Sequence, residues 1–163
     1  MSREKPKIYL ETTLFSFYHE TRKYGEYPKF RAQVREIFAR IKTGEYEPYT
    51  SELVLKEITD EMDQANQDQM KALIMEYGIQ VLDISDKEDR LADLYIQERA
   101  LSSAHISDAM HIAITAVHGL DFIVSLNFAH IARSWTIERV RRVNKREGYA
   151  AVGIYKPAEV LEL

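Results

Sequence analysis

The chain has 163 residues, enough to bury the core of one domain, and we expect residues 1–163 to form a single domain. It has no cysteine, which excludes disulfides, thiolate metal sites and cysteine nucleophiles. The net charge of −4 argues against a protein that coats nucleic acid non-specifically. The opening MSREKPKIYL lacks the apolar run of a signal peptide, and no stretch approaches the roughly 20 apolar residues of a membrane span. We therefore expect a cytoplasmic protein with no membrane contact.

Short apolar runs alternate with longer amphipathic stretches in the first half of the chain. The pattern predicts, in chain order, a buried strand at 7–10, a helix capped by Thr12 or Thr13, a loop at 24–28, a helix at 30–41, a strand at 46–50 and a helix that follows Ser51.

The second half continues the same alternation. It predicts a helix at 67–77, a strand at 79–84, helices at 86–101 and 107–118, a strand at 122–125, a basic helix at 134–146, a strand at 151–155 and a short helix opened by Pro157. Strands separated by helices are βαβ units, which form a mostly parallel sheet with helices on both faces. The predicted fold class is therefore a three-layer α/β/α domain.

Four polar residues lie where such a sheet binds ligands, beyond the carboxyl ends of its strands. Glu11 directly follows the first strand, and Asn127 lies just past the strand that ends at Ser125. Asp108 is in the first turn of its helix, and Glu57 lies within another helix. Carboxylate and amide oxygens without thiolates suit a hard cation such as Mg²⁺ or Mn²⁺.

Each of these residues also has an ordinary structural explanation. Glu57 could flank an apolar helix stripe, Asp108 could favour the helix dipole, and Asn127 could be a turn residue. Glu11 is the hardest to explain in this way, because an acid beside a buried strand loses solvation unless it is paired or metal-bound. The combination, rather than any single residue, favours a metal site.

Charge is unevenly distributed along the chain. Residues 57–98 contain twelve acidic and three basic side chains, whereas residues 133–146 contain six basic and one acidic. These can be two solvated helix faces of opposite sign. They can also be an acidic site with a basic rim that holds a phosphate backbone.

The histidines do not predict a zinc site. His111 and His118 are two turns apart on one helix, about 10.5 Å along its axis, too far to chelate one ion. We expect His111 to pack or hydrogen-bond beside Asp108. Trp135 and the ten tyrosines are expected to pack in the core and on the surface, with a minority able to stack unpaired bases.

The segments IYLETTLFSFY, SELVLKEI, SDAMHIA and DFIVSLNFAHI, in this order, resemble the motif set of PIN domains, in particular VapC-type toxins of toxin–antitoxin pairs. The resemblance extends to the closing GYAAVGIYKPAEV. It implies a metal-dependent endoribonuclease, a hydrolase. By resemblance, the acids of the metal site fall on Glu11, Glu57 and Asp108, and Asn127 takes the fourth catalytic position.

The resemblance also implies substrate contacts and partners. Thr12 and Ser125 match hydroxyl positions that line the site, and basic residues including Arg139 and Arg142 are expected to contact RNA phosphates. The expected cofactor is Mg²⁺ or Mn²⁺. The expected partners are RNA, a second copy of the chain and a cognate antitoxin, with an interface built from apolar side chains of the first two helices (Phe15, Phe17, Phe30, Phe38).

One position departs from the family pattern, because the first acid is normally aspartate and here is Glu11. The additional methylene moves the carboxylate by roughly 1.5 Å, and Mg²⁺ demands near-ideal geometry. Either the backbone has adjusted, or the metal is held through water, or the chain is a weakened or inactive PIN-like module that binds RNA or a protein. A phosphatase or phospho-receiver is disfavoured, because Glu11-Thr12-Thr13 stands where Asp-x-Asp would be.

Overall fold

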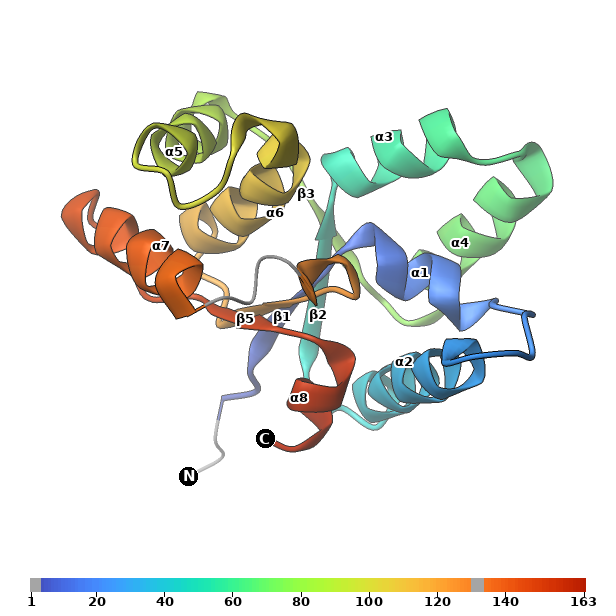
Figure 1. Ribbon diagram of the computed structural model, residues 1–163. Helices are drawn as coiled ribbons and strands as arrows, with labels where there is room; N and C mark the ends of the chain where they lie inside the picture. The colour runs from blue at the N-terminus through green and yellow to red at the C-terminus, as the bar shows by residue number, and fades with distance from the viewer. Residues whose placement is uncertain (1–3, 130–133) are drawn as a thin grey trace.

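A computed structural model describes residues 4–129 and 134–163 (Figure 1). The strands are β1 (Lys7–Leu10), β2 (Glu47–Ser51), β3 (Gln80–Leu82), β4 (Phe122–Val124) and β5 (Gly153–Tyr155). The helices are α1 (Thr12–Tyr18), α2 (Tyr27–Lys42), α3 (Glu52–Glu61), α4 (Gln64–Glu76), α5 (Asp86–Gln97), α6 (Ile106–Val117), α7 (Ser134–Arg146) and α8 (Pro157–Leu161). Two 3₁₀ turns, η1 (Ser103–His105) and η2 (Asn127–Ala129), precede α6 and α7.

The five strands form one sheet in the order β3-β2-β1-β4-β5, and every neighbouring pair is parallel. The chain builds outwards from β1 to β3 and then crosses to β4 on the other side of β1. In such sheets the place where the order reverses is where ligands bind, outside the carboxyl ends of the strands. Here that place lies between β1 and β4, where Leu10 pairs with Val124.

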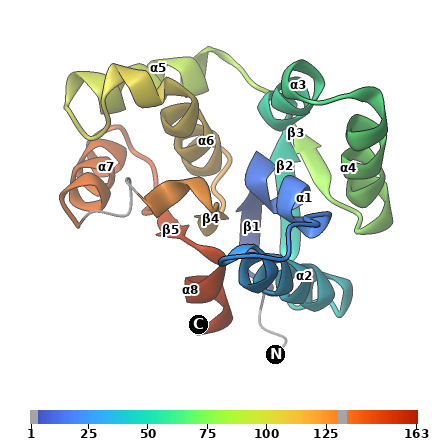
Figure 2. The same ribbon diagram turned by 45° about the vertical axis from the view of Figure 1, so that its right-hand side comes forward.

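Helices cover both faces of the sheet. Figures 1 and 2 show α1–α4 on one side and α5–α7 on the other, with α8 packed against α2. The predicted three-layer α/β/α architecture is confirmed, and the sheet is parallel throughout. Among the described helices, none is long and apolar enough to cross a membrane.

The core explains why β1 and β4 read as apolar runs. Ile8, Tyr9 and Leu10 are all fully buried, as expected for a strand covered on both faces. Phe15 and Phe38 are also fully buried and meet edge to face with centroids 6.0 Å apart. The expectation that these two rings contribute to a subunit interface is therefore wrong, because the domain's own core uses them.

Several predicted boundaries differ from the structure. The helix expected at 30–41 begins at Tyr27, inside the predicted loop, because Pro28 is tolerated in a first turn. The helix expected at 67–77 begins at Gln64, because Asp63 caps it by accepting a hydrogen bond from the Asn66 N–H (2.8 Å). The helix expected at 86–101 ends at Gln97. The strands expected at 79–84 and 151–155 are shorter, spanning Gln80–Leu82 and Gly153–Tyr155.

Candidate metal centre

Glu11 sits where β1 ends, beside the end of β4, and its N–H donates to the Val124 carbonyl (3.2 Å). It caps α1, and its side chain is 2% exposed. One carboxylate oxygen, Oε1, accepts from the Thr13 N–H (3.0 Å), the Thr13 hydroxyl (2.6 Å) and the Ser125 hydroxyl (2.6 Å). Within the described part of the chain, no hydrogen bond reaches the other oxygen, Oε2. The carboxylate is thus held in place by one oxygen and has the second available for a ligand.

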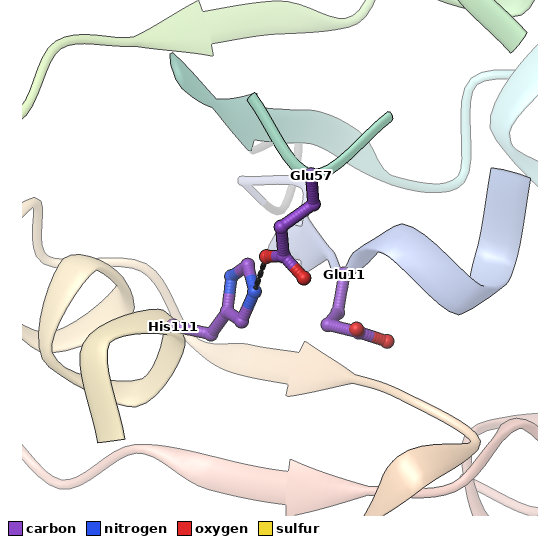
Figure 3. Close-up of side chains that lie close together, drawn as sticks. All are labelled: Glu11, Glu57 and His111. Carbon is purple, nitrogen blue, oxygen red and sulfur yellow. Dashed lines mark hydrogen bonds and ion pairs between the residues drawn. The ribbon is translucent and has the colours of Figure 1, made fainter. Parts of the chain in front are cut away.

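Glu57 and His111 approach Glu11 from two further elements. Glu57 projects from α3, and the Nε2 of the fully buried His111, on α6, is hydrogen-bonded to Glu57 Oε1. Figure 3 shows the Glu57 carboxylate between the imidazole ring and the Glu11 side chain. One ligand atom from each of the three residues lies within 4.8 Å of the others, so the three side chains converge on one small region.

A chain of buried hydrogen bonds holds the imidazole ring of His111 in place. Its Nδ1 is hydrogen-bonded to the Tyr9 hydroxyl (2.6 Å), which is also hydrogen-bonded to the Ser51 hydroxyl (2.7 Å). All three side chains are buried. The partner of one ring nitrogen sets the orientation of a histidine and which atom its other nitrogen presents. Tyr9 and Ser51, at the ends of β1 and β2, therefore aim His111 at Glu57.

Asp108 lies in the first turn of α6, with a side chain that is 17% exposed and lies 3.4 Å from His105 Nδ1. Burial, and then the negative charge of Glu11, raise the pKa of Asp108 above its usual value. Burial alone lowers the pKa of His111, but the hydrogen bond to Glu57 and the charges of the three acids outweigh it and raise that pKa. Both shifts follow from acids facing one another in a shielded place, which a bound cation would stabilise.

The remaining predicted residues contribute differently. The buried Ser125 hydroxyl, besides donating to Glu11, accepts from the Asn127 N–H (2.9 Å). Asn127 is therefore linked to Glu11 through its main-chain N–H and Ser125, while its side chain is exposed on η2.

The other predicted substrate-binding residues are not hydrogen-bonded to these acids in the part of the chain that the structure describes. The hydroxyl of Thr12 is buried and has no hydrogen-bond partner among the described residues. Arg139 and Arg142 lie on α7, where they line a separate pocket. Arg133, the first residue of the predicted basic segment, lies outside the described residues.

His111 is not among the metal-site residues that the sequence predicts, although the sequence does place this side chain beside Asp108. The available signal was the spacing of three residues, which puts Asp108 and His111 on one helix face. What the spacing could not show is that Glu57 faces His111 from α3, across 54 positions of sequence.

Tyr9→Phe tests the buried chain. It removes one hydroxyl and leaves Ser51 and the Nδ1 of His111 without their partner, so we expect a loss of about 2 kcal/mol in the free energy of unfolding. Urea denaturation of the metal-free protein measures it. Tyr24→Phe, at a tyrosine that is 67% exposed, is the control and should leave the stability unchanged. Equal stability of Tyr9→Phe and wild type would show that Tyr9 does not orient His111.

No protein-family model and no curated protein matches the chain.

Proposed function

We propose that this protein is a PIN-like, Mg²⁺- or Mn²⁺-dependent endoribonuclease that hydrolyses RNA phosphodiesters. The observation that carries the proposal is the convergence of Glu11, Glu57 and His111 within 4.8 Å at the carboxyl edge of a parallel sheet. The negative charge of Asp108 acts on the same group.

The donor set fits a hard cation. Because Nε2 of His111 is hydrogen-bonded to Glu57, the carboxylates of Glu11 and Glu57 would hold the ion and His111 would orient Glu57, while Asp108 would add negative charge to the group. Glu11 has one oxygen anchored by hydrogen bonds and the other available. The resulting ligand set is oxygen-rich and contains no thiolate, as Mg²⁺ and Mn²⁺ prefer.

The bound ion would supply a Lewis acid that polarises the phosphate and lowers the pKa of a water molecule. The protein's own side chains would determine where the ion and the phosphate lie. Glu11 and His111 close the buried side of the cluster, whereas Glu57 and Asp108 remain 19% and 17% exposed. A phosphate would approach from that open side. Ser125 and Thr13 keep the Glu11 carboxylate fixed during this approach.

The hydrogen bonds of Glu11 also bear on the alternative of a weakened, non-catalytic module. A decayed site would leave its unusual residue loosely held. Instead, the longer side chain reaches the Thr13 and Ser125 hydroxyls, both at 2.6 Å. This favours Glu11 as a working part of the site.

The test is a metal requirement measured in two ways. Calorimetric titration of the metal-free protein with Mn²⁺ is expected to show binding, and a labelled structured RNA is expected to be cleaved with Mg²⁺ or Mn²⁺ but not in EDTA. The metal supplies the Lewis acid, so its removal should abolish the reaction. Cleavage that persists in EDTA would contradict the proposal. Metal binding without cleavage of any RNA would leave the binding module as the better description.

A further inference from the structure

A second charged feature lies outside the acidic cluster. A pocket of about 380 Å³ opens between the C-terminal end of α5 and one face of α7, which lie side by side in Figure 1. Its lining includes four arginines, Arg99, Arg139, Arg142 and Arg146, and a single acid, Glu98. The pocket is therefore strongly positive although the whole chain is acidic.

Most of this positive charge is not neutralised by the fold. Arg146 donates to Glu98 (2.8 Å) and to Glu147 (3.3 Å). Glu98, the single acid in the lining, is therefore already paired with Arg146. Arg139 donates to the main-chain carbonyl of Arg99 (3.0 Å), which carries no formal charge. Among the described residues, no acid pairs with Arg99, Arg139 or Arg142. Three guanidinium groups in one pocket without a countercharge attract an anion.

The main-chain conformation of Arg99 also supports a binding role for its side chain. With φ at 59°, Arg99 is the only non-glycine residue at positive φ in the described chain. It follows the C-cap of α5, Glu98, at the position where glycine is the usual and less strained choice. An arginine kept at a strained position, with its side chain in a positive pocket, indicates a role for that side chain.

Trp135 adds an aromatic surface beside the arginines. It lies one turn before Arg139 on α7, is 45% exposed, and has the Arg139 guanidinium 5.0 Å from its ring centroid. An exposed aromatic ring next to phosphate-binding cations is the arrangement by which proteins hold unpaired nucleic acid, since an unpaired base can stack on the ring while its backbone meets the charges. Bases in a duplex are already stacked.

We propose that Arg99, Arg139 and Arg142 bind phosphates, and Trp135 stacks a base, of the single-stranded RNA segment that flanks the cleaved bond. This rests on the proposed function. Both walls of the pocket are joined to the elements of the metal centre: α5 leads through η1 into the first turn of α6, which carries Asp108, and α7 follows η2, which carries Asn127.

The test is fluorescence anisotropy with a short labelled single-stranded RNA in EDTA, and with the same strand annealed to its complement. Arg142→Ala and Trp135→Ala are each expected to weaken single-strand binding roughly tenfold. The control is Arg141→Ala, which removes an equal charge from an exposed neighbour on α7 outside the pocket and should change affinity less than about twofold. Wild type should bind the duplex more weakly than the single strand.

Arg99→Gly separates function from structure most sharply. Glycine relieves the positive φ, so the melting temperature should stay equal or rise, while RNA affinity should fall roughly tenfold. Unchanged affinity in this variant would overturn the role of Arg99. Equal losses in Arg141→Ala and Arg142→Ala would overturn the pocket, and duplex binding as tight as single-strand binding would overturn the stacking. Because binding is measured without metal, failure here leaves the cleavage proposal standing, and absent cleavage leaves the pocket standing.

Discussion

Asp108→Asn is expected to lower the rate of RNA cleavage by at least about a hundredfold. The substitution keeps the size of the side chain and removes one negative charge from a group in which Asp108 acts electrostatically on Glu11 and His111. A cation held beside an anionic phosphate needs that countercharge. The metal should therefore bind more weakly and in a different geometry, and calorimetric titration with Mn²⁺ should show the weaker binding directly.

The thermal stability of Asp108→Asn should not fall with its cleavage rate. Burial and Glu11 raise the pKa of Asp108, so its ionised carboxylate is less favourable in the folded protein than in the unfolded chain. Neutral asparagine removes that repulsion, and the melting temperature of metal-free Asp108→Asn should equal or exceed that of wild type. Asp93→Asn, an identical change at an exposed position of α5, is the matched control and should leave cleavage and metal binding intact. Full cleavage by Asp108→Asn would remove Asp108 from the mechanism.

Glu11→Asp is expected to lower the rate of cleavage by about a hundredfold, even though it introduces the residue usual in PIN domains. Shortening the side chain withdraws the carboxylate by roughly one bond length, about 1.5 Å. The hydrogen bonds from the Thr13 and Ser125 hydroxyls, both at 2.6 Å, require its present length. The free energy of unfolding should also fall, by about 1 to 2 kcal/mol, because the buried Ser125 hydroxyl loses its acceptor.

The measurement is single-turnover cleavage of one labelled RNA by wild type and by Glu11→Asp, with Mn²⁺ titrated to saturation for each. Glu61→Asp, an equal shortening at an exposed position of α3, provides the control and should behave as wild type. Faster cleavage by Glu11→Asp than by wild type would mean that Glu11 marks a decayed site rather than an adapted one.

Local patterns of the sequence were sufficient for the architecture. The apolar run at 7–10 predicts a strand buried on both faces, and amphipathic stretches between such runs predict helices that cover a parallel sheet. Glu11 was identifiable for the same reason, since a charged residue directly after a buried strand must lie at the carboxyl edge. Helix ends were less predictable. The start of α4 is set by Asp63, which accepts from the Asn66 and Gln67 N–H groups, and α5 ends earlier than its apolar pattern suggests.

The composition of the candidate site was decided by tertiary structure. The Ser125 hydroxyl reaches Glu11 because β4 pairs with β1, and that strand order follows from the packing of the whole sheet rather than from any local pattern. His111 meets Glu57 because α6 and α3 flank β1 from opposite faces of the sheet. Periodicity specifies which face of an element is buried. Which side chains then meet across the core depends on contacts between distant segments, which form only when the chain has folded.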